Sequence, residues 1–479
     1  MAEQRTFRME LPKQIITPKI VDLPNTDQLK EDLKAFLDRL PRYEWLEKYY
    51  TGAISPIYAN RPITPIANFC NRFTDRVVGY LTGNPPVYSA PDDSPGVQVT
   101  EKMTAQNLEQ TEGDVMQDLC IFGAGYQLTY LDDKTGDPKV AQYRPKVAFV
   151  AYDDTVKNDS VYGAIVQQAK NGGKISEKTK QVDLYTDKLH LVYLVDGDKW
   201  QLIEQIPHIF GRVPLIEYRN GRYGMALYEQ IIGLQDAYNS LLSDRVEDKR
   251  RFSSASLVLK GQIIGKDKPA IEKALEQLKE VPVIQLDTNA EAGYITKTMS
   301  ESDNQTLQDA LASEMYEQVG IPNMADEAFS GNSSGIAIQF KLLGLDLTVG
   351  RLKSSFNKGF TRRVKLYYAG LNNLMANQDF EIPPELDKVA IVFKENIPTD
   401  MVYEANTITT YYGAGLLSRQ TALDNMSMIE DTAGELLRLL EDDSRKLTEQ
   451  VNAWGGVNPA MGQPGGPAPE PPPDEDTGV

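Results

Sequence analysis

Apolar residues follow helical spacing in most of this chain and strand spacing in one stretch of its first half. Two early segments, one opening at Thr26 and one over residues 66–81, place apolar residues three and four apart, which predicts amphipathic helices. Thr26 is the expected cap of the first helix, and the glycine and prolines at 83–86 end the second. Strand-like segments separated by turn signals follow at 127–131, 146–151, 163–169, 182–185 and 190–195. The first half is therefore predicted to be an α+β domain.

Three long helices are predicted in the second half. The pattern favours helices over 225–251, 303–319 and 336–376, the last of them capped by Ser333 or Ser334. This last helix is predicted to have one broad apolar face that includes Leu352, Phe356 and Phe360. Between the first two lies a compact α/β module, with strands at 256–260 and 281–286 around a short helix at 269–280. Two helices that bracket a small module predict a hairpin that projects the module away from the body. A β segment at 389–394 and helices to about residue 451 complete the chain.

Charge is unevenly distributed. The chain has 68 acidic and 50 basic residues, a net charge of −18, which argues against a protein that grips nucleic acid through a general excess of positive charge. Residues 336–376 instead carry seven basic residues and one acidic residue. Residues 456–479 are rich in proline, glycine and acidic side chains and are expected to be disordered.

The sequence contains few residues and no motifs that indicate catalysis or metal binding. With two cysteines (Cys70, Cys120) and two histidines (His190, His208), a disulfide framework and a Cys/His zinc site of ordinary spacing are excluded. Packing or surface roles are expected for both histidines, and a core position for Cys70. Glycine-containing segments such as 261–267 fail the phosphate-loop spacing. We expect no catalysis, no metal, no cofactor and no membrane segment, and a soluble protein of cytosolic type.

Several short motifs occur in an order that matches one family. They are YYTG at 49–52, VVGYLTGNP at 77–85, IFGAGY at 121–126, YDDT at 152–155, GRVP at 211–214, LQDAYN at 234–239, GNSSGIA at 331–337, NIP at 396–398 and GLLS at 415–418. With this order around a helix–module–helix hairpin, the sequence resembles bacteriophage portal proteins of the SPP1-like type, from about residue 26 to residue 450.

The resemblance implies an α+β portal-type fold and a ring, usually of twelve subunits, around a channel for double-stranded DNA. It divides the chain into an N-terminal arm (1–25), a wing in two parts (26–225 and 336–400, the second with the long helix), two stem helices (226–252 and 301–319), a small α/β clip (253–300), a tunnel loop (320–335), a helical crown (401–455) and a tail (456–479).

The same resemblance implies the partners and the location. A portal ring conducts DNA during packaging and ejection and binds terminase and head–tail adaptor proteins, alongside major capsid and scaffolding proteins. The expected location is the portal vertex of the virion, after synthesis in the host cytoplasm. Two alternatives stay open: a nucleic-acid-processing enzyme, and a minor capsid or adaptor protein without a closed ring.

Three groups of residues are candidates for function. A DNA-facing role is favoured over a mobile connector for the tunnel-loop residues, because the loop is long, polar and lies between two long helices. For the cluster that ends the first stem helix, the favoured interpretation is that its cations stabilise the C-terminus of that helix. The alternative is that they contact DNA phosphates. For the basic stripe on the long helix, pairing with acidic surface on the neighbouring subunit is favoured over a solvated face. The residues are, in that order, Asp326, Glu327, Phe329, Asn332, Ser333 and Ser334; Lys249, Arg250 and Arg251; and Arg351, Lys358, Arg362 and Lys365.

One test follows from the stripe. Charge reversal at Arg362 and Arg363 is expected to weaken ring formation.

Overall fold

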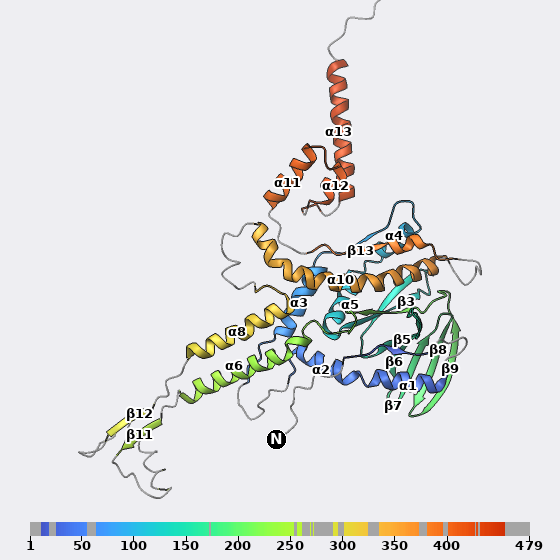
Figure 1. Ribbon diagram of the computed structural model, residues 1–479. Helices are drawn as coiled ribbons and strands as arrows, with labels where there is room; N and C mark the ends of the chain where they lie inside the picture. The colour runs from blue at the N-terminus through green and yellow to red at the C-terminus, as the bar shows by residue number, and fades with distance from the viewer. Residues whose placement is uncertain are drawn as a thin grey trace, which may run out of the picture. The chain divides into compact units, whose positions relative to one another are not determined.

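The computed structural model describes residues 11–18, 25–54, 64–171, 174–252, 256–260, 269, 272, 291–295, 301–323, 335–372, 381–395, 401–426, 428–429 and 432–455. The chain divides into two compact units, residues 1–396 and residues 397–479. Helices and mostly antiparallel sheets make up the first unit, and helices make up the described part of the second, so the α+β class is confirmed (Figure 1).

Two sheets form one half of the first unit. The larger has the strand order β1 (Ile15–Ile16), β5 (Ala148–Tyr152), β6 (Ser160–Asn171), β7 (Lys174–Tyr185), β8 (Leu189–Asp196) and β9 (Lys199–Pro207). Its pairs are antiparallel apart from β1, a strand of the N-terminal arm, which lies parallel to β5. The smaller sheet has the antiparallel order β10 (Leu215–Arg219), β3 (Ala124–Leu131) and β4 (Pro138–Tyr143).

Successive side chains of β5 are buried on opposite faces of the larger sheet. Phe149 packs with helix α1 (Thr26–Leu37), and Val150, on the opposite face, packs with residues of the smaller sheet such as Leu215. This is the two-residue period of a strand buried on both sides. The larger sheet therefore lies between α1 and the smaller sheet.

Asparagines cap the first two predicted helices. The Asn25 side chain, not that of Thr26, caps α1 by accepting a hydrogen bond from the Asp27 backbone N–H at 3.0 Å. Helix α3 (Phe69–Thr82) begins three residues later than predicted, and Asn68 caps it by accepting from the Asn71 N–H. A short side-chain carbonyl readily reaches the unpaired N–H groups of a first helical turn. This explains why α1 is capped at Asn25 and why α3 begins after Asn68. Three further helices were not predicted: α2 (Leu40–Thr51), α4 (Gly96–Ala105) and α5 (Glu109–Phe122).

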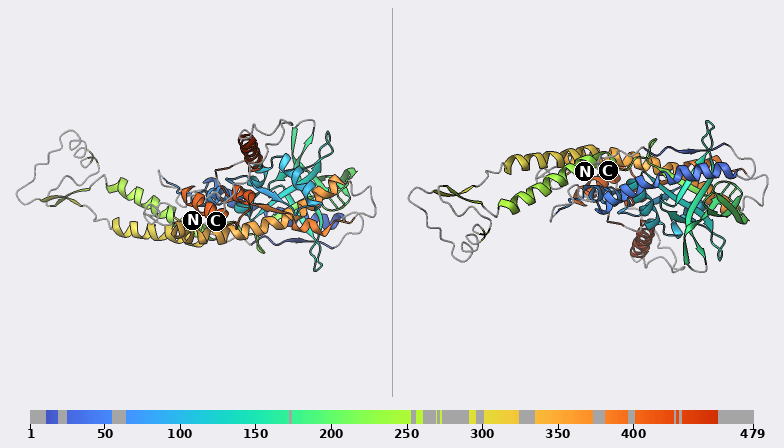
Figure 2. Two further views of the ribbon diagram at one scale, coloured as in Figure 1. Left: turned by 90° about the horizontal axis from the view of Figure 1, so that it is seen from above. Right: turned by 90° about the horizontal axis from the view of Figure 1, so that it is seen from below.

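The predicted hairpin is present as α6 (Ile232–Phe252) and α8 (Glu301–Val319), which lie side by side and extend away from the sheets (Figures 1 and 2). Arg245 joins them by donating to the Gln305 side chain at 2.9 Å. Helix α6 starts later than the predicted residue 225, after a 3-10 turn, η1 (Glu229–Ile231). The Glu229 carboxylate accepts from the Ala226 N–H at 3.0 Å, which stabilises that separate turn.

Part of the module between the two helices is described. Strand β11 (Ser256–Lys260) coincides with the predicted strand and pairs antiparallel with β12 (Glu291–Ile295). The strand predicted at 281–286 and the helix predicted at 269–280, apart from residues 269 and 272, lie outside the described residues.

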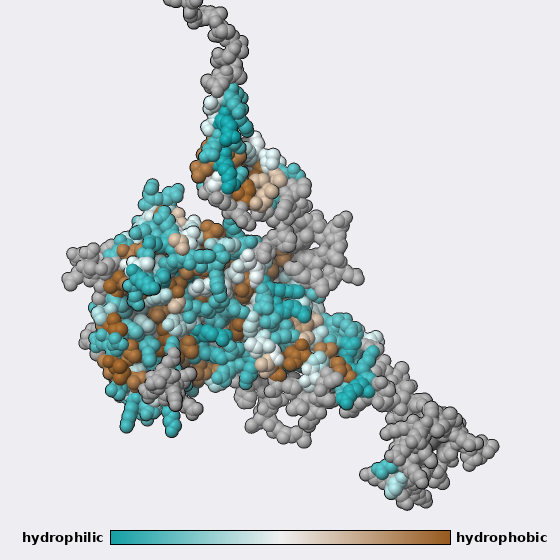
Figure 3. Space-filling view, turned by 180° about the vertical axis from the view of Figure 1, so that it is seen from behind, coloured by the Kyte–Doolittle hydropathy of each residue, from teal (hydrophilic) through white to brown (hydrophobic). Residues whose placement is uncertain are grey.

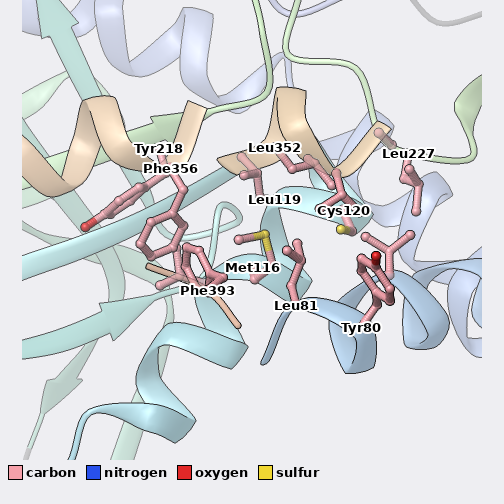
Figure 4. Close-up of a cluster of buried hydrophobic side chains, with 14 of the residues drawn as sticks. Tyr80, Leu81, Met116, Leu119, Cys120, Tyr218, Leu227, Leu352, Phe356 and Phe393 are labelled. Atoms are coloured by element: carbon pink, nitrogen blue, oxygen red, sulfur yellow. The ribbon is translucent and has the colours of Figure 1, made fainter. Parts of the chain in front are cut away.

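Helix α10 (Gly335–Leu371) forms the centre of the main core. Its predicted apolar face is confirmed over the described side chains: Leu352 and Phe356 pack with Met116 and Leu119 of α5 (Figure 4). The Phe356 ring lies 4.7 Å from that of Tyr218 on β10. A Cβ on Gly359 would lie 2.5 Å from the Tyr218 ring, so a glycine is required for this approach of helix and sheet.

Short elements complete the two units. In the first, β13 (Ala390–Val392) lies within the predicted β segment and pairs with β2 (Val87–Ser89), next to the 3-10 helix η3 (Pro384–Lys388). The second consists of α11 (Met401–Gly413), α12 (Arg419–Asp424) and α13 (Thr432–Gly455), as the helical pattern predicts. An Arg419–Asp443 ion pair of 2.5 Å joins α12 to α13. Residues 456–479 lie outside the described residues.

The cysteines and histidines have structural positions. Cys70 and Cys120 are free thiols in the main core, and burial raises the pKa of both, that of Cys120 to about 12. His190 stacks on Tyr185 with ring centroids 4.2 Å apart, and a ring nitrogen of His208 lies 3.0 Å from the Thr186 carbonyl. These contacts agree with the predicted packing roles. Within the described ranges, no helix is long and apolar enough to cross a membrane.

Asp118 makes stability depend on pH. Its side chain on α5 is buried, and burial raises its pKa to about 7, against the attraction of Arg144 and a 2.7 Å hydrogen bond from Gln142. Between about pH 4 and pH 7 the native carboxyl keeps a proton that the unfolded one releases, so this contribution to stability falls as pH rises. Asp118→Asn is therefore expected to raise the free energy of unfolding by about 2–4 kcal/mol at pH 8 and by little at pH 4.

Urea unfolding at pH 4, 6 and 8 measures this effect. The exposed Asp133, changed to asparagine, is the matched control and is expected to show no such trend. An Asp118→Asn gain that did not grow with pH would contradict the assignment.

Candidate functional site: the basic side of the long helix

Some of the candidate residues lie outside the described residues. These are the tunnel-loop set Asp326, Glu327, Phe329, Asn332, Ser333 and Ser334, and the side chain of Arg251. Lys249 and Arg250 are exposed in the last turn of α6, and a guanidinium nitrogen of Arg250 lies 4.0 Å from the Glu247 carboxylate one turn earlier. For the tunnel loop and this cluster, the roles inferred from sequence stay predictions.

A cavity of about 390 Å³ lies on the side of α10 opposite its apolar face. The turn after β10 forms one wall, and the Gly221 N–H donates to the Ser355 hydroxyl at 3.1 Å, which holds that turn against α10. The N-terminal arm contributes Gln14 to the lining. Four cations and one carboxylate line the cavity, which gives it a net positive charge: Arg219, Arg222, Lys358, Arg362 and Glu217.

Neighbouring groups hold two of these arginines in place. Arg362 donates to the Tyr152 hydroxyl at 3.2 Å, and its guanidinium lies 5.5 Å from the centre of that ring, a cation–π contact. Arg219 donates to the Pro12 carbonyl of the arm at 2.5 Å and lies 3.4 Å from the buried Glu217 carboxylate. The arm therefore docks against the same cavity, and Arg219 is largely used in holding it.

A second cavity of about 420 Å³ shares Gly221 and Arg222 with the first. It lies where the end of α8 meets α10, and Arg351 lines it beside the exposed Leu347. Across the two cavities run four cations that we call the basic strip: Arg222, Arg351, Lys358 and Arg362. Within the described part of the chain, none of the four forms an ion pair with a carboxylate, and all but Arg362 are largely exposed.

The strip differs from the stripe predicted from sequence in two ways. Lys365, on the same side of α10, forms a 2.6 Å ion pair with Asp387 of η3, so its charge is already balanced within the chain. Arg222 was missed, because the Asn220-Gly221 pair indicates a turn but not which helix that turn contacts.

Arg363 does not lie on this surface. Its side chain is fully buried and pairs with the equally buried Glu112. A charge reversal there would test folding, so the test proposed from sequence at Arg362 and Arg363 must be changed.

The chemistry of the strip is electrostatic. Across the described residues, no group of three or more histidine, cysteine, aspartate or glutamate side chains is arranged to hold a metal ion. Guanidinium and ammonium groups without carboxylate partners, placed along α10 and in the turn beside it, are suited to bind an anionic surface.

Comparison with known proteins gives consistent matches. A family model described as "Phage portal protein, SPP1 Gp6-like" matches residues 29–449. The portal protein of Bacillus phage SPP1 is 20% identical over 395 residues, which cover 79% of this chain and 76% of that protein. The portal protein of Clostridium phage phiCD119 is 21% identical over 350 residues, covering 66% and 76%.

One solved structure is also similar. A chain from the virion of a native gene transfer agent particle is 11% identical, with a TM-score of 0.40 over 73% of this chain and 87% of that one.

Proposed function

This chain belongs to the SPP1 Gp6-like family of phage portal proteins, and from that membership we propose that it forms a ring, usually of twelve subunits in this family, through which double-stranded DNA enters and leaves the capsid. It is thus a phage virion protein whose family has a structural role rather than a catalytic one. The observation that carries the proposal is the family match over residues 29–449, which includes both hairpin helices and α10.

We assign the parts of the ring as follows. Helices α6 and α8 form the stem, the module between them forms the clip, the two sheets with α10 form the wing, and α11–α13 form the crown. In the family the clip faces the terminase motor and later the head–tail adaptors. Residues 320–335 narrow the channel as the tunnel loop, and the cluster Lys249, Arg250 and Arg251 lies near its exit.

The charge of α8 supports its place at the channel wall. The helix has five acidic residues and no basic one, and Asp303, Asp309, Glu314 and Glu317 are exposed. Basic side chains bind DNA phosphates and release the counterions condensed on the DNA, and α8 has no basic side chain. A wall with this charge lets DNA slide rather than bind.

The basic strip is proposed to lie at the interface between subunits. Ring contacts join two different faces of each subunit, so an acidic surface on the next subunit would pair with the basic strip on this one. Lys358→Glu/Arg362→Glu is expected to weaken subunit association about tenfold or more, because like charges then face each other. Native mass spectrometry over a dilution series measures the ring fraction.

A matched control separates this effect from a change of overall charge. Lys188→Glu/Lys199→Glu changes the net charge equally at exposed positions, in the turn between β7 and β8 and on β9, and is expected to leave ring yield unchanged. If both double variants behave alike, the strip is not at the interface.

Negative-stain microscopy of the purified wild-type chain tests the proposed function itself. Closed rings with a central channel are expected. Particles without a channel would favour the adaptor or minor capsid alternative, and metal-dependent cleavage of DNA would favour the enzyme.

A further inference from the structure

The described part of the C-terminal unit has almost no core of its own. Over its described residues, the side chains that are more than nine-tenths buried are Ala422 and Leu423 of α12. Larger apolar side chains point outward instead, and Figure 3 shows hydrophobic side chains on the surface of this unit. The exposed set is Tyr411, Tyr412, Leu416, Met428, Leu437, Leu440 and Leu447.

A unit built this way is not expected to be stable alone. Ordering each residue costs conformational entropy that buried apolar area must offset, and two small buried side chains offset little of it. Small three-helix units are stable when their helices share a common apolar interior. The interior of this unit must therefore be completed by other surfaces.

One of its two apolar surfaces lies on α13. Leu437, Leu440 and Leu447 are three and seven residues apart, so they lie along one side of the helix, and each is more than half exposed. The neighbouring flank of α13 is held against α12, where Arg419 pairs with Asp443. Helix α12 has six residues, too few to cover the length of α13, which has 24. We call the three leucines the α13 patch.

The other apolar surface lies on and just after α11. Tyr411 and Tyr412 are about half exposed in its last turn, and Leu416 is 72% exposed in the turn that follows. We call these three residues the α11 patch. It combines two aromatic rings and a leucine, whereas the α13 patch is purely aliphatic. Helices α11 and α13 are separate elements of the unit (Figure 1).

We propose that the α13 patch of one copy packs on the α11 patch of the next copy around the ring, so that the core of the C-terminal unit forms between subunits. This inference rests on the proposed ring. In a closed ring each subunit uses two different surfaces, one toward each neighbour, and this unit carries two apolar surfaces of different composition. Tyrosine packs its ring against aliphatic side chains while its hydroxyl stays in water, which suits an interface that is exposed in the free chain.

Photo-crosslinking tests the contact directly. Full-length chains carrying p-benzoylphenylalanine in place of Leu440 are prepared with and without ¹⁵N, mixed in equal amounts and assembled into rings. Crosslinks to residues 411–416 that join a labelled to an unlabelled chain are expected. The same group in place of the exposed Arg445, on another side of α13, is expected to give at least about tenfold fewer such crosslinks.

Hydrogen exchange provides a second, independent measurement. In assembled rings, Leu437→Ser/Leu447→Ser is expected to speed amide exchange in α13 about tenfold or more, since the helix loses its covering. Arg445→Ser/Glu449→Ser on the polar side of α13 is the control and is expected to change exchange little.

The outcomes are distinguishable. If wild-type rings form but crosslinks from residue 440 stay within one chain, or reach only residues 1–396, the inference is wrong and the proposed function stands. Unchanged exchange in the double leucine variant would also overturn it. If the wild-type chain forms no ring, the proposed function fails, and the inference fails with it.

Discussion

Replacing Arg363 with methionine is expected to lower the free energy of unfolding by about 3–5 kcal/mol, because Glu112 is then left as a buried charge without its partner. The two side chains form a fully buried ion pair between α10 and α5. Arg363 also donates to Gln127 of β3 at 3.1 Å, and its guanidinium lies 4.9 Å from the Phe360 ring. One side chain therefore joins the long helix to a helix and a strand. Urea unfolding at concentrations that keep the chain monomeric measures the loss.

Two further variants show whether the loss comes from the unpaired charge. Arg363→Met/Glu112→Leu removes both charges and is expected to recover more than half of the lost free energy of unfolding. The reason is that the free energy needed to take both charges out of water offsets most of the attraction between them. Lys365→Met breaks the more exposed pair with Asp387 and is expected to cost no more than about 1 kcal/mol. An Arg363→Met variant about as stable as Lys365→Met would contradict this account of the core.

Arg42→Leu is expected to have the second largest effect, a loss of about 3–5 kcal/mol together with loosening of the turn before α6. Arg42 of α2 is 3% exposed and lies 2.5 Å from a carboxylate oxygen of Glu229 in η1. It also donates to the Phe122 carbonyl at 3.3 Å and to the Gly224 carbonyl at 3.1 Å. One guanidinium thus holds the end of α5, the turn after β10 and the start of the stem.

Amide hydrogen exchange near the turn distinguishes a role of Arg42 in positioning the stem from a role in packing alone. Amide exchange over residues 219–231 is expected to rise by more than exchange in the larger sheet, and ring yield is expected to fall, because the same turn carries Arg222 of the basic strip. Lys102→Leu breaks a partly exposed pair with Asp137 and is expected to cost no more than about 1 kcal/mol. A uniform rise in exchange across the first unit would count against a role in positioning the stem.

These two arginines connect fold to function. The buried side of α10, which includes Arg363, joins the helix to the core, and its opposite side presents Arg351, Lys358 and Arg362 of the basic strip. Arg42 fixes where the hairpin leaves the body. A ring of such subunits would depend on both, since the strip and the stem must meet their neighbours at constant positions.

Much of the helical architecture was predictable. Periodic apolar residues indicated α1, α3, α6, α8 and α10, and the face of α10 toward the core was read correctly at Leu352, Phe356 and Phe360. Helix α2 was missed because its apolar and polar residues follow no clear period. The cap of α1 was placed one residue too late, at Thr26 instead of Asn25, because serine, threonine, asparagine and aspartate compete for that position on equal terms in sequence.

The charged residues show where prediction from sequence ended. Helical spacing placed Arg362, Arg363 and Lys365 close together on α10, yet one lines a cavity, one is fully buried and one pairs with η3. The partner of Arg363 lies 251 residues earlier in the chain. Spacing along a helix reports which side a residue is on, and not what the rest of the chain places there.

The sequence by itself therefore determined the order of the elements, the apolar faces of the long helices and the family, because these depend on local periodicity and on motifs in linear order. The tertiary structure alone decided which cations are free to meet a partner and where Arg222 joins them. It also decided that the C-terminal helices leave their leucines uncovered. The physical reason is that burial and ion pairing are set by contacts between distant segments, whose strength depends on three-dimensional distance and on exclusion of water.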